Sequence, residues 1–213
     1  MISSTITNYW KLDVTVNMSK LHDVQSPLFR AFTEEQYAND FIRGKFRFGE
    51  LGRYRRIEDQ SRQDASEGYG HYVDSRNHQW HTELGGAIYV LSFSGPDVDQ
   101  YFLRERMGAF VVRLDDPEGF CRDIERHMES RGIRSFNGIH GRLVEYTRGQ
   151  TIRREMDAGQ RAMLSVTQKP DTFRHECEYR LYTILNQHPR CLVAEFLPID
   201  LGGLLRCAEV LCG

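Results

Sequence analysis

The sequence predicts an α+β fold with a mixed or antiparallel sheet and flanking helices. The expected elements begin strand–helix–strand and continue mostly as strands with one or two helices, unlike the regular alternation of doubly wound folds. No GxGxxG motif follows an expected strand and no GxxxxGKS/T motif is present, so the common nucleotide-binding α/β folds lack their signature. The 213 residues fit a single domain at 26–213, preceded by a polar N-terminal arm at 1–25.

The first elements of the domain follow from local signals. Residues 26–32 (SPLFRAF) are expected to form a short strand. Thr33 begins a TEEQ sequence in which Gln36 has the spacing of a capping box, so a helix is expected from there to Gly44. The alternating residues at 45–51 predict the next strand.

The middle of the chain contains the clearest strand and the clearest helix. The apolar run at 87–93 predicts a strand, which a Gly-Pro pair at 95–96 ends. A helix is expected over 116–132, with Asp116 as N-cap and Pro117 at the first helical position. The other expected elements are helices at 101–108 and 153–166 and strands at 109–115, 141–148, 173–185 and 191–198, before a short C-terminal tail.

The composition and net charge argue against several classes of protein. The net charge of −2 is near neutral, so bulk charge does not indicate nucleic-acid binding. The five cysteines are odd in number and include no CxxC pair, which argues against a disulfide framework or a cysteine zinc site and favours a reducing cytoplasm. No signal peptide and no apolar stretch of membrane-spanning length are visible, so no membrane partner is expected.

The segment FRHECEYRLYTIL at 173–185 carries charge at the start of an apolar strand. If the whole segment is one strand, alternation places Glu176, Glu178 and Arg180 on one face, which then becomes apolar. Two carboxylates on one strand face lie roughly 6.6–7 Å apart along the chain. This spacing lets one carboxylate meet a ligand while the other meets an incoming nucleophile, so the two glutamates are candidate functional residues.

Two other positions have residue types that suit a ligand. Arg30 lies inside an apolar strand, which is costly unless the arginine pairs with an anion. Ser92 and Ser94 end the clearest strand and can donate hydrogen bonds to a carboxylate or a sugar hydroxyl. The structural alternative is that Arg30 pairs across the sheet with Glu176 or Glu178 and that the serines are ordinary strand-end residues.

From about residue 28 onward the chain resembles a widespread family of uncharacterised bacterial proteins. The resemblance rests on LFRAF and FIRGKFRFGEL, then IYVLSFS, then Lys169 followed by FRHECEYRL. Members share a start of the type YR–helix–glycine–strand, a central CFS-like strand and a late E-x-E-W/Y-R motif. The chain departs from the family after the second strand, where GRYRRIEDQSRQDASEG stands in place of an Asn-Asp-Pro-Phe-like turn.

A more distant resemblance concerns chemistry. Arginine on an early strand, serine on a middle strand and Glu-x-Glu on a late strand is similar in order and type to the Arg-Ser-Glu class of ADP-ribosyltransferases. The resemblance implies a split sheet and NAD as the substrate. It implies that Arg30 holds the NAD phosphates or the nicotinamide-side ribose, and that Ser92 or Ser94 positions the catalytic carboxylate. Glu178 would stabilise the oxocarbenium-like state and Glu176 would orient or deprotonate the acceptor. The usual Ser-Thr-Ser is Ser-Phe-Ser here, so the choice of serine stays open.

This resemblance predicts a specific geometry. Arg30, a serine and Glu178 are expected to converge on one cleft between two sheet halves, near Tyr37 or Tyr54, which are assigned to NAD binding. The glutamates would stay in contact with solvent at the mouth of the cleft. The function predicted is that of an NAD-consuming toxin or defence effector in a bacterial cytoplasm. Its partners would be a protein or nucleic-acid acceptor and an antitoxin or other neutralising protein.

The segment 52–70 offers an alternative function. It is dense in charge and poor in apolar residues, so it is expected to be a long functional or disordered loop with at most a helical turn. Its arginines could contact nucleic acid while Tyr54 stacks on a base, which would make the chain a non-catalytic binding module. The arginines assigned to this interface are Arg53, Arg55, Arg56 and Arg62.

A third hypothesis is a magnesium-dependent nuclease. Glu58, Asp59 and Asp64 of the same segment, together with Glu178, could supply oxygen ligands for Mg²⁺. The spacing of these residues has no diagnostic pattern, so no metal site is assigned.

Overall fold

The computed structural model describes residues 24, 26–56, 68–73, 79–83, 87–135, 138–148, 158–185 and 194–211. The fold is α+β, as the sequence predicts. Eight of the described strands form one sheet in the order β11–β2–β5–β1–β6–β12, with β10 also beside β5 and β7 beyond β10, and all of its pairs are antiparallel. These strands are β1 (Leu28–Phe32), β2 (Lys45–Glu50), β5 (Ala87–Ser94), β6 (Phe110–Leu114), β7 (His140–Leu143), β10 (Glu178–Leu185), β11 (Phe196–Asp200) and β12 (Ala208–Leu211).

The remaining elements lie around this sheet. Two further two-stranded sheets are β3 (Tyr69–Val73) with β4 (Gln79–Glu83) and β8 (Glu145–Arg148) with β9 (Gln168–Pro170). The helices are α1 (Glu35–Ile42), α2 (Gln100–Phe102), α3 (Pro117–Ser130) and α4 (Ala158–Thr167). Short turns of other helical types are η1 (Leu51–Arg56), η2 (Leu103–Met107, a π-helical turn) and η3 (Asp171–Glu176).

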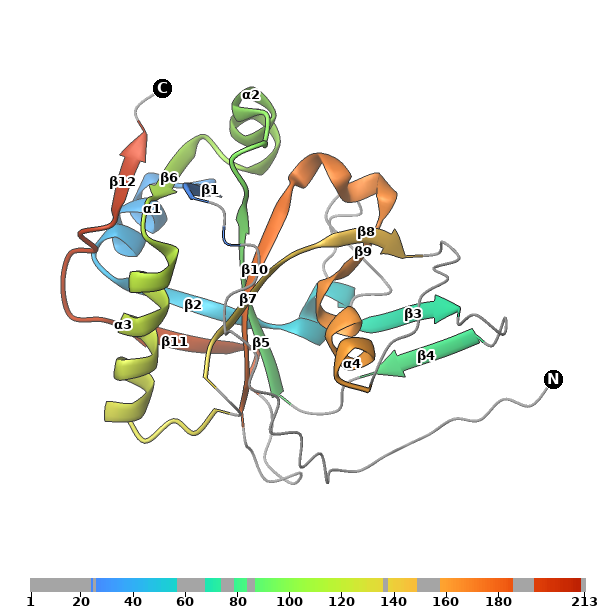
Figure 1. The fold of residues 1–213 in the computed structure, drawn as a ribbon. Helices are drawn as coiled ribbons and strands as arrows, with labels where there is room; N and C mark the ends of the chain where they lie inside the picture. The colour runs from blue at the N-terminus through green and yellow to red at the C-terminus, as the bar shows by residue number, and fades with distance from the viewer. Residues whose placement is uncertain are drawn as a thin grey trace.

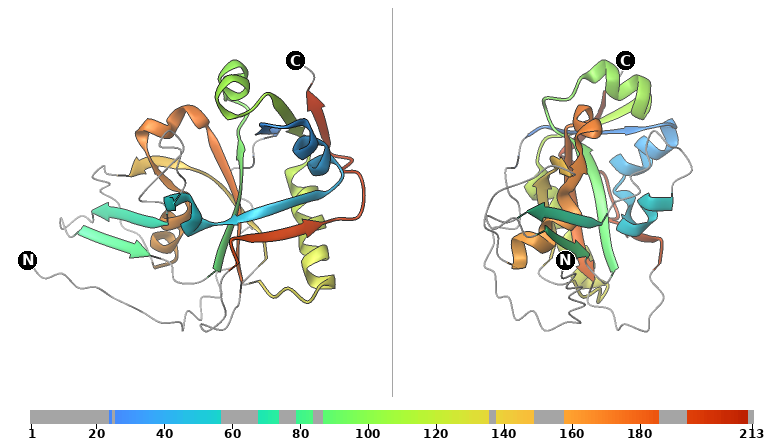
Figure 2. Two further views of the ribbon diagram at one scale, coloured as in Figure 1. Left: turned by 180° about the vertical axis from the view of Figure 1, so that it is seen from behind. Right: turned by 90° about the vertical axis from the view of Figure 1, so that its right-hand side faces the viewer.

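The helices divide between two sides of the central strands. Helices α1 and α3 lie on one side of β5 and β10, and α4 lies on the other side with the two small sheets (Figures 1 and 2). The larger core is on the α1–α3 side and includes Phe41, Phe93 and Phe120, whose rings contact one another. A smaller apolar cluster on the α4 side includes Val90 and Tyr182. Each face of the central strands is therefore buried under a different layer.

Strand β5 is the place where the sheet divides. It pairs with β10 along its whole length, from Ala87 to Ser94. Its other edge is shared, because β2 pairs with it at Tyr89 and Val90 while β1 pairs with it at Ser94. The sheet therefore forks beside β5, and the early, middle and late strands β1, β5 and β10 are neighbours, as expected.

Three helix ends test the local predictions. The side chain of Asp116 accepts a hydrogen bond from the Gly119 backbone N–H at 2.8 Å, which confirms the predicted N-cap of α3. The predicted capping box at Thr33 is wrong, because α1 begins one residue later with Glu34 as its N-cap and makes no side-chain capping bond. Gly44 has a φ of +75°, the left-handed conformation that ends α1 as predicted.

Several boundaries differ from the prediction. Part of the predicted 52–70 loop is structured, since η1 begins at 51 and β3 starts at 69, while residues 57–67 lie outside the described residues. The predicted tail contains β12, which the sequence analysis missed. The predicted strand at 141–148 is two strands, and the one at 191–198 is replaced by β11 at 196–200. The predicted N-terminal arm lies outside the described residues except for Val24.

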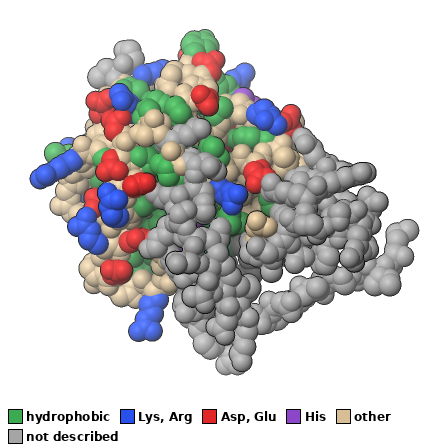
Figure 3. All heavy atoms as spheres, viewed as in Figure 1, with side chains coloured by type: hydrophobic (Ala, Val, Ile, Leu, Met, Phe, Trp, Pro, Cys, Tyr) green, Lys and Arg blue, Asp and Glu red, His purple; other side chains and the backbone are tan. Residues whose placement is uncertain are grey.

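Within the described part of the chain, no helix is long and apolar enough to cross a bilayer. Acidic and basic side chains are interspersed on the face that Figure 3 shows, and no patch of one sign dominates it. Cys121, Cys177 and Cys207 have free thiols.

Candidate functional site

The segment 173–185 is not one strand. Residues 171–176 form η3, and β10 begins only at Glu178. Cys177 between them has a φ of 45° and a ψ of 45°, in the left-handed region that non-glycine residues seldom adopt. This turn, rather than strand alternation, brings the neighbouring side chains of Glu176 and Glu178 to the same cation.

That cation is the ammonium group of Lys169, the middle residue of β9. Its Nζ lies 2.7 Å from Oε2 of Glu176 and 2.8 Å from Oε2 of Glu178. Arg180 completes the group, because its Nε donates to Oε1 of Glu178 at 2.8 Å and its second terminal nitrogen to Oε2 at 3.2 Å. We call Lys169, Glu176, Glu178 and Arg180 the charged cluster.

The charged cluster is almost closed to solvent. Glu178 is 5% exposed and Glu176 is 9% exposed. Burial acts to raise the pKa of Glu178, but Arg180 and Lys169 outweigh it and hold this pKa well below the ordinary value. Burial raises the pKa of Glu176, against the opposing charge of Lys169. The two carboxyl groups therefore share one lysine but have pKa values displaced in opposite directions.

Backbone contacts hold the cluster between the sheet and the α4 side. The hydroxyl of Tyr146 on β8 accepts a hydrogen bond from the Glu178 backbone N–H at 2.6 Å. Arg180 also donates to the carbonyl of Val166 in α4. Burial and the charge of Glu178 raise the pKa of Tyr146, so this phenol stays protonated. The cluster is thus tied to β8, β9 and α4 as well as to β10.

The two candidate serines lie beside this cluster. In the β5–β10 pair Glu178 stands opposite Ser94 and Arg180 stands opposite Ser92. Directly opposed residues in an antiparallel pair share one face of the sheet, so both serines lie on the glutamate face. The structure brings together both predicted serines and both predicted glutamates.

Arg30 does not join them. Its neighbour Phe29 stands opposite Ser94, so alternation along β1 places Arg30 on the other face of the sheet. Its guanidinium lies 5.4 Å from the ring centroid of Phe32 and 5.8 Å from that of Phe93, and both rings belong to the α1–α3 side. It donates a hydrogen bond to the main-chain carbonyl of Ser92, which lies in the fork between β2 and β1.

This position gives Arg30 a structural function. Between its pairings with β2 and with β1, β5 has no neighbouring strand on that edge, and the guanidinium supplies a donor there. The prediction that Arg30, a serine and Glu178 converge on one open cleft is therefore wrong. The suggested ion pair between Arg30 and a glutamate is also absent from the described contacts, because the glutamates pair with Lys169 and Arg180.

The tyrosines and arginines predicted to bind NAD or nucleic acid do not gather around the charged cluster where the structure describes them. Tyr37 is 47% exposed on α1, and α1 lies on the side of the sheet opposite to α4 and the charged cluster (Figure 1). Arg53 in η1 stacks on Phe196, with its guanidinium carbon 4.7 Å from the ring centroid. Residue 62 and the side chains of residues 54–56 lie outside the described structure, so the predicted roles of Tyr54, Arg55, Arg56 and Arg62 stay predictions.

Sequence reasoning missed the role of Lys169. Its position before FRHECEYRL belonged to the family resemblance, but no spacing rule connects a residue on β9 with two glutamates seven and nine residues later. Arg180 had a signal, since it follows Glu178 by two residues on the same strand face. Residues 58, 59 and 64 of the magnesium hypothesis lie outside the described residues. Within the described ranges no three His, Cys, Asp or Glu side chains are grouped to hold a metal.

Comparison with known proteins gave no match to a protein-family model, a curated protein or a solved structure.

Proposed function

We propose that the chain is an enzyme that cleaves the nicotinamide–ribose bond of NAD and transfers ADP-ribose to a macromolecular acceptor. One observation carries the proposal: two glutamates bound to one buried lysine have pKa values displaced in opposite directions, beside two serines. Neighbouring carboxyl groups whose pKa values are pushed apart are typical of acid–base pairs in active sites. Buried ionic clusters with a purely structural role also occur, so activity is the deciding test.

The chemistry assigns a different role to each glutamate. Departure of nicotinamide builds positive charge on the ribose, and the ionised Glu178 stabilises that charge in a water-poor site. Glu176 removes a proton from the acceptor nucleophile, because a raised pKa makes a carboxylate a stronger base. Ser94, opposite Glu178, can hydrogen-bond the ribose or the carboxylate.

The proposal requires the charged cluster to open. The Lys169 ammonium group fills the space between the two carboxylates, so a substrate must displace it or move η3. The left-handed Cys177 is a point of backbone strain at the junction of η3 and β10, and such strain often marks segments that work in catalysis or binding. Arg30 no longer has a part in holding NAD, because it lies on the opposite face.

The experiment is an assay of nicotinamide release. Purified protein is incubated with NAD and with protein, DNA and RNA acceptors, with and without EDTA. We expect release that EDTA leaves unchanged, since the proposed chemistry uses no metal. Absence of release under every condition, including in cells that express the chain, would refute the proposal. In a bacterial cytoplasm such an activity would be toxic or defensive, and a neutralising protein would be expected to control it.

A second candidate function is nucleic-acid binding at a basic surface. The guanidinium carbon of Arg47 lies 3.8 Å from the ring centroid of Phe196, the same ring that Arg53 contacts. Neither arginine is in an ion pair with a described acidic residue. We expect salt-dependent binding of single-stranded RNA or DNA that weakens when Arg47 and Arg53 are both changed to Ala. Binding that the double substitution does not alter would exclude this surface.

A further inference from the structure

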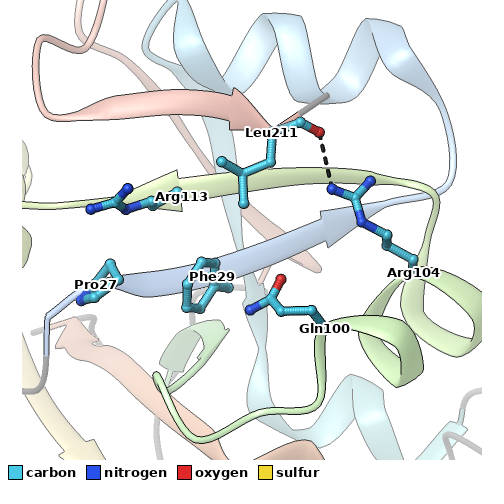
Figure 4. Close-up of a pocket in the computed structure, with 6 residues that line it drawn as sticks. All are labelled: Pro27, Phe29, Gln100, Arg104, Arg113 and Leu211. Atoms are coloured by element: carbon cyan, nitrogen blue, oxygen red, sulfur yellow. Dashed lines mark hydrogen bonds between the residues drawn. The ribbon is translucent and has the colours of Figure 1, made fainter. Parts of the chain in front are cut away.

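A hollow of about 540 Å³ lies beside β1, β6 and β12, and no function described above uses it. Figure 4 shows Phe29 of β1 and Leu211 of β12 at its centre, with Gln100 of α2 beside them. Arg104 stands at one end, and Arg113 with Pro27 at the other (Figure 4). The hollow is an open depression rather than an enclosed cavity, and its apolar centre with a few polar groups at the rim is the usual composition of ligand sites.

The two arginines that line the hollow differ in whether a described carboxylate pairs with them. Arg113 lies 2.8 Å from Asp115 and 3.4 Å from Glu209, so its charge is compensated. Arg104 donates to the main-chain carbonyls of Ala109 and Leu211 at 3.2 and 3.3 Å, and no described carboxylate pairs with it. One end of the hollow therefore has a positive charge whose described partners are neutral, which favours an anionic ligand.

The segment that carries Arg104 is held close to β1. Arg104 belongs to the π-helical turn η2, a type of turn that is frequent at functional sites. Gly108 ends it with a φ of 149°, and a Cβ at this position would lie 2.4 Å from the carbonyl carbon and oxygen of Phe32. Only glycine allows this close approach, so the position of Arg104 over the hollow is fixed by the backbone.

The hollow lies on the same sheet face as the two glutamates. One cross-strand row joins five strands, in which each member stands opposite the next: Glu178, Ser94, Phe29, Arg113 and Glu209. With adjacent strands 4.7–4.9 Å apart, Phe29 is roughly 10 Å from Glu178. The hollow and the charged cluster are thus neighbours on one surface of the sheet.

Two contacts also join these regions directly. Cys177, between the glutamates, packs against the apolar cluster that contains Phe29. His175 of η3 makes an edge-to-face contact with Phe102 of α2 at a centroid distance of 4.6 Å, next to Gln100. A ligand that occupies the hollow would therefore touch elements that also hold η3.

We propose that this hollow binds the phosphate-bearing part of a nucleotide, with the phosphate at Arg104 and the flat apolar part on Phe29 and Leu211. Its identification as the site for the ADP-ribose portion of NAD rests on the proposed function. Arg104 then takes the role that the sequence analysis gave to Arg30. The ligand class follows from a guanidinium whose described partners are main-chain carbonyls, beside an aromatic and an aliphatic side chain, with an amide to hydrogen-bond a base or sugar.

Calorimetry with ADP-ribose, AMP and inorganic phosphate tests the site. We expect ADP-ribose and AMP to bind more tightly than phosphate. The substitution Arg104→Ala should weaken ADP-ribose binding about tenfold to a hundredfold, the usual effect of losing a hydrogen bond between charged groups. Arg106→Ala is the matched control, because Arg106 is exposed, two residues away and outside the hollow. The affinity of the Arg106→Ala variant for ADP-ribose should equal that of the unmodified chain.

A second measurement does not depend on how the variant folds. In the unmodified chain, ADP-ribose should shift the methyl resonances of Leu211, while those of the exposed Leu204 should stay in place. The inference is overturned if neither nucleotide binds, if phosphate binds as tightly as ADP-ribose, or if Leu211 does not respond. Binding in the hollow without nicotinamide release leaves the inference intact and refutes the proposed function. If the Arg104→Ala variant releases nicotinamide with an unchanged KM for NAD, the proposed function stands and the inference about the hollow is refuted.

Discussion

The ammonium group of Lys169 lies 2.8 Å from a carboxylate oxygen of Glu178, and both side chains are almost fully buried. Two buried charges stabilise a fold only when each keeps its partner, because desolvation costs each ion several kcal/mol. Lys169 also holds Glu176, so one side chain supports two carboxylates. The stability of the fold and the proposed chemistry thus depend on the same residue.

Replacing the lysine should destabilise the chain strongly. Lys169→Met leaves Glu176 without the partner described for it and Glu178 with Arg180 alone, so the free energy of unfolding should fall by about 3–5 kcal/mol. Urea unfolding followed by circular dichroism measures the change. The matched control is Arg174→Ala, which removes an exposed ion pair with Asp171 at 2.6 Å and should cost less than about 1 kcal/mol. Equal effects of the two substitutions would contradict the account of the cluster.

The opposite pKa displacements predict that stability is greatest near pH 4.5, the ordinary pKa of both carboxyl groups. The pKa of Glu178 is below its ordinary value of 4.5, so its ion pairs stabilise the fold above that pH, and this stability is lost as the pH falls toward the folded pKa. The pKa of Glu176 is raised, so the folded chain binds its proton more tightly, and stability increases as the pH falls through this raised pKa toward 4.5.

Urea unfolding at pH values from about 7 to 3 tests this shape. Glu178→Gln should flatten the loss of stability below pH 4.5, and Glu176→Gln should abolish the rise in stability that occurs as the pH falls toward 4.5. The comparison uses the slopes with pH, because each substitution also changes the absolute stability. Unchanged slopes in both variants would show that neither carboxyl group has a displaced pKa in the folded chain.

Arg30 should prove structural. Arg30→Met removes the donor that bonds the Ser92 carbonyl in the fork of the sheet, so the free energy of unfolding should fall by about 1–3 kcal/mol. The affinity for ADP-ribose, measured per folded molecule, should stay the same, because Arg30 lies on the opposite face. A variant with normal stability and lost affinity would restore the original assignment of Arg30 to the NAD phosphates.

Gly108 should tolerate no side chain. The free energy of unfolding of Gly108→Ala should fall by about 2 kcal/mol or more, since the added Cβ meets the Phe32 backbone and the residue has a φ of 149°. In Gly203→Ala the added Cβ has no atom within 4 Å, and the change should stay within about 0.5 kcal/mol. Thermal unfolding of both variants measures the difference, and equal melting temperatures would contradict it.

Local sequence patterns were sufficient to predict many of the helices and strands. The apolar run before Gly95 gave β5, and Asp116 with Pro117 gave α3, because strands and helices of this kind depend on neighbouring residues. The β3–β4 hairpin was missed, since its residues lie in a polar and histidine-rich region without a clear apolar alternation. β12 was missed because an edge strand that pairs only with β6 has few residues and a weak pattern.

Only part of the candidate site could be predicted from the sequence. Glu178 and Ser94 were correctly expected on neighbouring strands, since the order of the strands followed from the resemblance. The face on which Arg30 lies depends on its register with β5, and a shift of one residue reverses every side chain of a strand. The prediction that the glutamates stay in contact with solvent is wrong, because Lys169 and the left-handed Cys177 bury them, and these are tertiary features without a sequence signal.

The central claim is that Glu178 and Glu176 act together on NAD, and the rate of nicotinamide release tests it most directly. The rate is compared per folded molecule for the unmodified chain, Glu178→Gln and the control Glu129→Gln, whose exposed carboxylate lies on α3 across the sheet. We predict measurable release, a loss of about 100-fold or more in Glu178→Gln and no loss in the control. If folded Glu178→Gln releases nicotinamide at the same rate, or if the unmodified chain releases none, the buried charges have only a structural role.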